Sequence, residues 1–187
     1  MDSDDPRQHV LETADRLFYG RGVQAVGMDE LRQAAGVSFK RLYALFPSKE
    51  DLVLAVLARR HRMWEDGVSA RVERAASPRE RLLGIYDYLA DWFAEDSFRG
   101  CGFINAFGEL GSVSPRVADA AREHKRAFQD YVAGLVHDAG APAELGPQLC
   151  ILAEGAQTTA AIAGTPDAAV QARRVAEVLI DAAAPER

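Results

Sequence analysis

The sequence predicts an all-α protein in which a small bundle of short helices is joined by one long helix to a larger helical part. Apolar residues recur at spacings of three and four along the 187 residues, and no convincing stretch alternates with a period of two. A capping residue stands before a proline four times, at Asp5-Pro6, Ser77-Pro78, Ser114-Pro115 and Thr165-Pro166. Proline suits the first position of a helix because its missing N–H costs nothing there and its fixed φ is helical.

Each helix is predicted from its own start and stop signals. The first helix is expected over 6–19, with Gly20 and Gly22 ending it. The fourth begins at the Ser48 cap, and the fifth at Ser77, which has Glu80 three residues later as in a capping box. The expected ranges, in order, are 6–19, 28–35, 39–45, 48–74, 78–95, 103–110, 115–139, 143–163 and 166–183.

Charge is divided unevenly along the chain, whose formal net charge is −6. Residues 6–62 hold ten Lys/Arg and six Asp/Glu, a balance of +4, whereas 63–187 hold twelve and nineteen, a balance of −7. A basic smaller part and an acidic larger part suggest two tasks. We expect a disordered tail at 1–5, a helix-turn-helix domain at 6–50, and a ligand-binding and dimerisation domain at 51–187.

The stretch AAGVS, residues 34–38, joins the second and third predicted helices. Gly36 stands where the chain must turn sharply, and only glycine takes a positive φ there without steric cost. Ser38 is a good N-cap for the third helix. Two short helices joined in this way are typical of the helix-turn-helix motif, whose second helix lies in the DNA major groove.

The third predicted helix has an unusual outer face. Leu42 is expected to point to the core, which leaves Phe39, Lys40, Arg41 and Tyr43 pointing outward. Cations can pair with guanine edges and an aromatic ring can contact the thymine methyl. Lys49, at the start of the fourth helix, is placed for a phosphate. The plain alternative is that these are ordinary solvated charges and half-buried rings.

The segment AAGVSFKRLYALFPSKEDLVLAVL resembles the DNA-binding signature of the tetracycline-repressor (TetR) family of bacterial transcription regulators. The shared features are Phe18 and Gly22 at the end of the first helix, Ala-Gly-Val-Ser at 35–38, Leu42-Tyr43, Phe46, and Ser-Lys-Glu at 48–50 followed by Leu52. The resemblance implies an all-α homodimeric repressor with a small-molecule effector. It also implies phosphate contacts from Tyr43 and Lys49, with Phe39, Lys40 and Arg41 near the bases.

Two positions depart from that family pattern. Gly27 stands where a capping Thr or Ser is usual, so a hydroxyl that often touches phosphate is missing. Arg32 replaces a small residue, and its guanidinium is expected to extend outward to a phosphate. The predicted DNA-binding residues are therefore Arg32, Ser38, Phe39, Lys40, Arg41, Tyr43 and Lys49.

The last two long helices are the predicted homodimer interface. Residues 149–164 are rich in Ala, Gly and Thr, which lets helices approach closely, and Ala156 and Ala160 are expected at that contact. Two helices from each subunit would form a four-helix bundle. The alternative is that these residues form an ordinary intramolecular core.

Aromatic residues gather in the middle of the sequence, and apolar walls with a few polar groups are typical of ligand pockets. The predicted effector-binding residues are Trp64, Trp92, Phe93, Phe103, Asn105, Phe107, Glu109, His124, Phe128 and Tyr131. Glu109 is the expected carboxylate of that pocket. The alternative is that the aromatic residues belong to the core. The same region also resembles, more weakly, the regulatory domain of one branch of the family.

No motif of a catalytic, metal or cofactor site occurs. The four histidines have no metal-ligand spacing, and no GxSxG, P-loop or GxGxxG is present. Two cysteines, Cys101 and Cys150, leave a single disulfide open. The polar N-terminus is unlike a signal peptide and no apolar run could span a bilayer. The expected protein is a cytoplasmic, ligand-responsive DNA-binding regulator, most often a repressor in this family, that binds operator DNA and no membrane. The alternatives are a helical ligand carrier or enzyme without DNA binding, and a regulator that answers to a protein partner.

Overall fold

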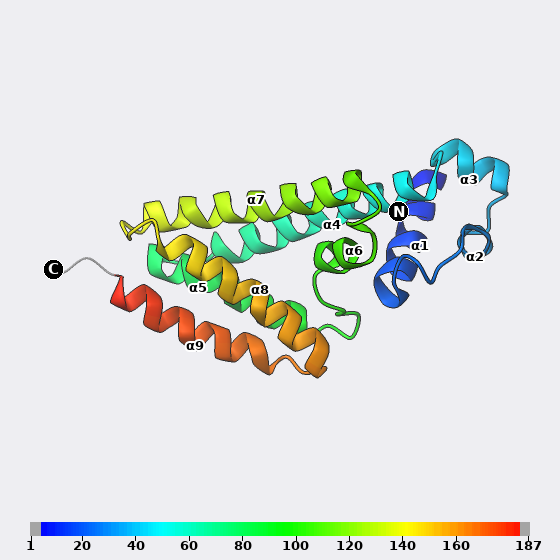
Figure 1. The fold of residues 1–187 in the computed structure, drawn as a ribbon. Coiled ribbons are helices and arrows are strands. Elements are labelled where there is room, and N and C mark those ends of the chain that lie inside the picture. Colours follow the sequence, from blue (N-terminus) through cyan, green and yellow to red (C-terminus); the bar gives the residue numbers. More distant parts are fainter. Residues whose placement is uncertain (1–4, 184–187) are drawn as a thin grey trace. The chain divides into compact units, whose positions relative to one another are not determined.

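The computed structural model describes residues 5–183, and within that range the chain forms nine helices and no strand (Figure 1). The all-α prediction is confirmed. The predicted tail at 1–5 lies outside the described residues, apart from Asp5. The helices are α1 (Pro6–Arg21), α2 (Met28–Ala34), α3 (Phe39–Leu45), α4 (Lys49–Val72), α5 (Pro78–Phe93), α6 (Gly102–Leu110), α7 (Pro115–Asp138), α8 (Leu145–Ala163) and α9 (Asp167–Ala182).

Local capping explains where most helices begin. Asp5 accepts a hydrogen bond from the Arg7 N–H at 2.9 Å, which caps α1. The Ser77 hydroxyl accepts from the Glu80 N–H at 3.2 Å, and the Glu80 carboxylate accepts from the Ala76 N–H at 3.1 Å. Such bonds satisfy the amides that a helix leaves unpaired in its first turn. The starts of α1 and α5 are therefore set by neighbours in the sequence.

The predicted bounds differ from the observed ones by one or two residues at every helix except α3, and the differences at α1 and α9 show why. Helix α1 continues through Gly20 to Arg21, and Gly22 ends it with φ of 88°. Only the second glycine takes the positive φ that a side chain would resist, whereas a helical Gly20 costs only about 1 kcal/mol relative to alanine. At α9, Thr165 was expected to cap a helix starting at Pro166, but Pro166 occupies the cap position and the helix begins at Asp167.

The helices form two compact units, which are described separately. Of the described residues, the first contains 5–62 and 102–122, and the second contains 63–101 and 123–183. Helices α4 and α7 contribute to both units and lie beside each other within each (Figure 1). In the first unit Arg116 of α7 pairs with Glu50 and Asp51 of α4, at 2.8 and 2.9 Å.

The core of the first unit is built mainly by α1 to α4. The fully buried side chains Val10, Leu31, Leu42 and Leu52 come from these four helices, one from each. Asp15 of α1 is also buried, and its carboxylate accepts a hydrogen bond from Arg60 of α4. A buried carboxylate requires such a partner. The apolar core and this ion pair therefore hold α1 against α4.

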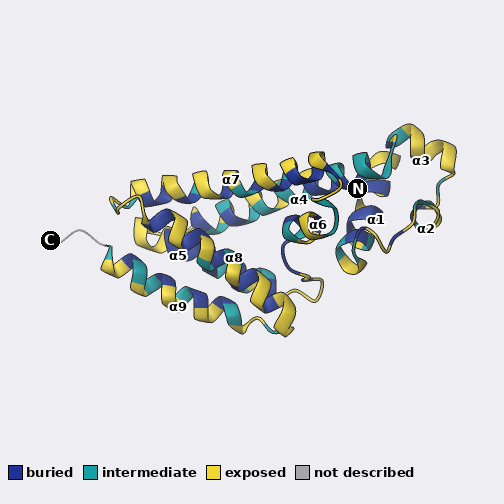
Figure 2. Cartoon of the chain, in the orientation of Figure 1, coloured by how far each residue is buried: buried dark blue, intermediate teal, exposed yellow. Residues whose placement is uncertain are grey.

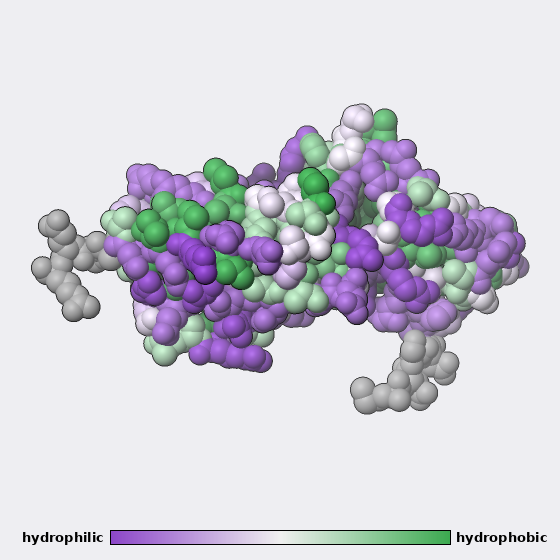
Figure 3. All heavy atoms as spheres, turned by 90° about the horizontal axis from the view of Figure 1, so that it is seen from below, coloured by the Kyte–Doolittle hydropathy of each residue, from purple (hydrophilic) through white to green (hydrophobic). Residues whose placement is uncertain are grey.

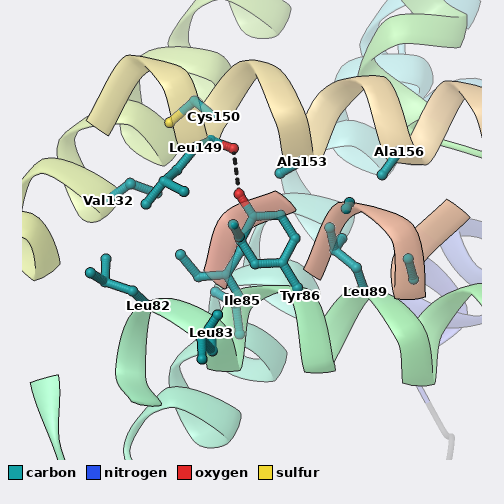
Figure 4. Packing of buried hydrophobic residues seen from close by; sticks show 14 of the residues in the cluster. Leu82, Leu83, Ile85, Tyr86, Leu89, Val132, Leu149, Cys150, Ala153 and Ala156 are labelled. Atoms are coloured by element: carbon teal, nitrogen blue, oxygen red, sulfur yellow. Dashed lines mark hydrogen bonds between the residues drawn. The ribbon is translucent and has the colours of Figure 1, made fainter. Parts of the chain in front are cut away.

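The core of the second unit lies between α5, α8 and α9 (Figure 4). Tyr86 is fully buried there, and its hydroxyl donates to the Leu149 carbonyl of α8 at 2.8 Å. Burial raises the pKa of Tyr86 far above its ordinary value, so the phenol keeps its donor proton. At the edge of this core, Arg79 of α5 contacts both carboxylate oxygens of Asp181 of α9, at 2.6 and 2.9 Å.

Replacing Tyr86 by phenylalanine is expected to lower the free energy of unfolding by about 1–2 kcal/mol. The change keeps the ring but removes the buried hydroxyl that donates to the Leu149 carbonyl, a loss of about that size. Urea denaturation would measure it. The matched control is Tyr43→Phe, whose hydroxyl lies on an exposed residue and whose loss should change stability by less than about 0.5 kcal/mol. Equal midpoints for Tyr86→Phe and the parent chain would contradict the expectation.

Helices α8 and α9 bury their small residues and expose larger ones. Ala156 and Ala160 are 6% and 2% exposed within the single chain, so the prediction that they lie at the dimer contact is wrong. They pack in the core with Ala169, Ala172 and Ala176 of α9. The large apolar side chains left exposed on these two helices are Ile151, Ile162, Val170, Val175 and Val178. Figure 3 shows hydrophobic side chains gathered on the face where α8 and α9 lie.

Both cysteines, Cys101 and Cys150, are buried as free thiols, and burial raises the pKa of Cys150 to about 12. The disulfide that the sequence left open is therefore absent. Across residues 5–183, none of the helices combines the length and the apolar character that a bilayer span requires.

Candidate nucleic-acid interface and effector site

The turn between α2 and α3 has the geometry that the sequence predicted. Gly36 has φ of 64°, and its N–H donates to the Gln33 carbonyl at 3.1 Å. The Ser38 hydroxyl accepts from the Arg41 N–H at 3.2 Å and caps α3. Leu42 anchors α3 in the core with no exposed area. Ser38 is thus occupied as a cap, and its predicted DNA contact stays a prediction.

The outer face of α3 carries the predicted DNA-binding side chains. Phe39, Lys40, Arg41 and Tyr43 are all exposed (Figure 2). Phe39 and Tyr43 are 42% and 44% exposed, although both are large aromatics. Their rings stack with centroids 6.1 Å apart and planes 17° apart. An aromatic pair beside two cations, held on a rigid helix, is suited to contacts with base edges and phosphates.

Arg32 lies beside that aromatic pair. Its guanidinium carbon is 4.6 Å from the centre of the Phe39 ring, and one nitrogen is 2.6 Å from Asp29. The guanidinium thus lies between Asp29 of α2 and the Phe39 ring of α3, and its predicted phosphate contact stays a prediction. A surface ion pair of this kind contributes only about 0–1 kcal/mol, so a DNA phosphate could replace Asp29 at little cost.

Lys49 stands at the first position of α4, 5.9 Å from the centre of the Phe18 ring. Burial lowers its pKa, and the nearby charge of Glu109 opposes that shift. The unpaired amides at the start of a helix can also bind a phosphate. One of them is already taken, because the Ser48 hydroxyl accepts from the Asp51 N–H at 3.0 Å. A phosphate at this helix start would therefore meet the lysine charge with one amide fewer to donate to it.

The ten predicted effector-binding residues fall in both units. Phe103, Asn105, Phe107 and Glu109 belong to α6 in the first unit, and the other six belong to the second unit. On α6, Phe103 is buried, whereas Phe107 is 48% exposed and Asn105 is exposed.

In the second unit the predicted residues form two aromatic clusters. Trp64 of α4 makes edge contacts with His124, Phe128 and Tyr131 of α7, with ring centroids 5.2, 5.3 and 6.4 Å apart. His124 and Phe128 are buried, and Trp64 and Tyr131 are half-buried. The other cluster joins Trp92 and Phe93 to Phe98, with centroids 5.2 and 4.7 Å from the Phe98 ring.

Glu109 was predicted as the carboxylate of an effector pocket, but its carboxylate makes a different contact. Its two carboxylate oxygens accept from the Val23 N–H at 3.0 Å and the Gln24 N–H at 2.8 Å. The Gln24 side chain in turn donates to the Glu109 carbonyl at 2.6 Å. This set of three hydrogen bonds, called here the Glu109 clasp, ties the end of α6 to the turn after α1. The predicted need of this carboxylate for a partner is met by backbone amides.

Sequence reasoning missed the partners of these contacts. Gln24 and Glu109 are 85 positions apart, and no spacing or motif pairs them. The same holds for Arg116 with Glu50 and Asp51, although the Ser114-Pro115 start of α7 was recognised. Ser114 joins the start of α7 to α4, because its hydroxyl donates to Glu50 and accepts from the Val117 N–H at 3.1 Å. The hydrogen bond from Ser114, followed by the one from Arg116, lowers the pKa of Glu50.

Comparison with known proteins places this chain among transcription regulators. Residues 10–56 match the family model "Bacterial regulatory proteins, tetR family", and residues 78–176 match "Tetracyclin repressor-like, C-terminal domain". The crystal structure of SCO4454, a TetR-family transcriptional regulator from Streptomyces coelicolor, is similar with a TM-score of 0.89 and 27% identity. That likeness covers 96% of each chain.

Of two curated relatives, one is a transcriptional activator and the other is a transcriptional repressor. The transcriptional activator FasR of Mycolicibacterium smegmatis is 32% identical over 149 residues, which are 79% of this chain and 67% of FasR. The transcriptional repressor NemR of Escherichia coli is 26% identical over 118 residues, which are 62% of this chain and 59% of NemR. Together with the exposed α3 face and the two family matches, these relatives show that the chain belongs to the TetR family of DNA-binding transcriptional regulators.

Proposed function

We propose that the chain acts as a homodimeric repressor that binds a palindromic operator and is released by a small apolar or aromatic effector. The observation that carries the proposal is the outer face of α3, where Lys40 and Arg41 stand beside the stacked rings of Phe39 and Tyr43. Lys40 and Arg41 would face base edges, and Tyr43 and Lys49 would contact phosphates. Residues 6–50 would form the DNA-binding domain, and 51–187 the ligand-binding and dimerisation domain.

A second copy of the chain is the proposed occupant of the exposed α8 and α9 surface. Val170, Val175 and Val178 of α9 and Ile151 and Ile162 of α8 are each at least 48% exposed. A two-fold symmetric operator requires a two-fold symmetric protein, with half-sites about 34–36 Å apart. Two helices from each subunit would bury these side chains in a four-helix bundle.

The aromatic cluster around Trp64 is the proposed effector contact. His124 and Tyr131 give it two polar groups among edge-to-face rings. The proposed effector is apolar and aromatic or extended, because aromatic walls attract such surfaces and cationic ends. Effector binding would shift the population of dimers away from the spacing that fits both half-sites. The protein would act in the cytoplasm, where the operator DNA is, and would carry out no catalysis.

Selection of binding sites from random duplex DNA by the purified chain is the test. A palindrome with two half-sites should be enriched, and lipophilic compounds should both quench tryptophan fluorescence and release that DNA. Failure to enrich any sequence would contradict the proposal. Release by anionic metabolites and not by lipophilic ones would contradict the effector class.

An activator is the second candidate, because FasR is named as one. Whether the chain represses or activates can be measured separately, by placing the selected operator either across a reporter promoter or upstream of it. Repression is expected to need an operator that overlaps the promoter, whereas an activator would raise transcription from an upstream position.

A further inference from the structure

Arg7, in the first turn of α1, contacts the far end of α3. Its guanidinium donates a hydrogen bond to the carbonyl of Leu45, the last residue of α3, which is 38 positions away in the sequence. The guanidinium carbon also lies 4.3 Å from the centre of the Phe46 ring. A planar guanidinium can lie against an aromatic face while its N–H groups donate to a neighbouring oxygen. Arg7 therefore joins the start of α1 to the end of α3 by two contacts.

The end of α3 is short of hydrogen-bond donors from its own chain neighbours. The Phe46 N–H donates to the Leu42 carbonyl at 2.9 Å, but the next residue, Pro47, has no N–H to donate. Phe46 itself is extended, with φ of −137° and ψ of 103°, as is usual before a proline. The last carbonyls of a helix that stops in this way need donors from elsewhere. Arg7 supplies the donor for Leu45.

The angle of α3 depends on what holds its far end. Of the seven residues of α3, all of them described, only Leu42 is buried, and Phe46 just beyond the helix is 1% exposed. A helix of this length is about 10 Å long, so a tilt of about 10° about one end moves the other end by about 2 Å. Side chains in a binding site must be held within about 0.5 Å of their working positions. The hold on Phe46 therefore controls where Phe39 and Lys40, at the other end, meet the DNA.

We propose that Arg7 is a positioning residue for DNA recognition, which fixes the angle of α3 through Leu45 and Phe46 and contacts no base. The proposal rests on the proposed function, because it concerns how the same α3 face is presented to the operator. A direct phosphate contact is the other role open to an exposed arginine at this position. The two roles predict different results in the three measurements below.

NMR of the backbone amides, recorded on the full chain without DNA, is the first test. Arg7→Met removes the guanidinium from an exposed residue, so the fold should survive. The amide signals of Phe39 and Lys40, in the first turn of α3, are expected to shift, because the helix takes a new angle. Arg16→Met is the matched control, since it removes an exposed arginine from the same helix, and should leave both signals in place.

Unchanged Phe39 and Lys40 signals in Arg7→Met would overturn the proposal. A pure phosphate contact predicts that result, because its loss has no effect on the free protein. This measurement uses no DNA, so its outcome is distinct from any failure to find an operator.

DNA affinity is the second test, with the selected operator and random duplexes at several salt concentrations. Arg7→Met should weaken operator binding about tenfold, as for the loss of one hydrogen bond from a charged group, and random binding by less than about twofold. The salt dependence should stay the same, because no phosphate contact is lost. Equal losses on both kinds of DNA, with a salt dependence shallower by about one unit, would identify a phosphate contact and overturn the proposal.

A double-mutant cycle with Phe46→Leu tests the route from Arg7 to α3. If Arg7 acts through the Phe46 ring, the loss of operator affinity in the double variant should fall short of the product of the two single losses. Two losses that multiply in full would show that Arg7 acts independently of Phe46, which contradicts the proposed route. Phe46 is buried, so circular dichroism would first confirm that each variant is folded. The two tests on Arg7→Met alone do not depend on this variant.

Discussion

Replacing Val175 and Val178 together by arginine is expected to convert the proposed dimer into a folded monomer that has lost tight operator binding. The two residues are 48% and 67% exposed in the single chain, so arginine can extend into solvent and the monomer fold should survive. They lie three positions apart on one face of α9. In the proposed four-helix bundle, each arginine would be buried without a partner and would face a second copy of itself.

The expected loss of dimer stability is large. Leaving a charge buried and unpaired costs about 3–5 kcal/mol, which corresponds to a dimer that is roughly 140- to 4,000-fold weaker. Sedimentation velocity would measure the oligomeric state, and circular dichroism would check the fold. A monomer contacts one half-site only, so affinity for the palindromic operator should fall in parallel.

The matched control for this variant is Val113→Arg. Val113 is 74% exposed, in the turn between α6 and α7, and lies outside the α8 and α9 surface. Its replacement should leave the dimer intact. If the Val175 and Val178 double variant still sediments as a dimer, the second copy binds elsewhere and the proposed interface is wrong.

The second large effect separates base contacts from phosphate contacts. Arg41→Ala should weaken binding to the selected operator by about 1–3 kcal/mol, if its guanidinium pairs with a guanine, and should change binding to random DNA much less. Lys49→Ala should weaken binding to both kinds of DNA alike. It should also make the salt dependence shallower by about one unit, because one phosphate contact is lost.

Fluorescence anisotropy at several salt concentrations, with operator and random duplexes, would measure both effects. Arg122→Ala is a suitable control, because Arg122 is an exposed arginine on α7, paired with Asp119 at 2.6 Å and distant in sequence from the α3 face. Equal losses on operator and random DNA for Arg41→Ala and Lys49→Ala would show that the two roles are wrongly assigned.

Arg41 and Lys49 also differ in how far they are exposed and in what surrounds them. Arg41 is exposed on α3, and only its backbone N–H is held, by the Ser38 cap. Lys49 is half-buried against Phe18, and burial lowers its pKa. A phosphate that approaches Lys49 would favour the charged lysine, so binding should weaken as the pH rises toward the lysine pKa.

Local features of the sequence determined where most helices begin and which residues of α3 are exposed. The Ser77 and Ser114 caps are hydrogen bonds within a few residues of the chain, and the positive φ of Gly36 follows from its lack of a side chain. The exposed face of α3 followed from helical periodicity, because one buried leucine, Leu42, fixes which side points outward. These are interactions between near neighbours, so they can be predicted without the fold.

The tertiary structure decided which partners meet across long separations. Glu109 was expected in an effector pocket, but its carboxylate is taken by the Val23 and Gln24 amides. Ala156 and Ala160 were expected between subunits, but α5 and α9 cover them within one chain. Composition shows that a helix face carries small residues or that a carboxylate needs a partner. It does not show which of several helices, each able to bury that face or supply that partner, packs there, because this depends on the free energy of the whole assembled core.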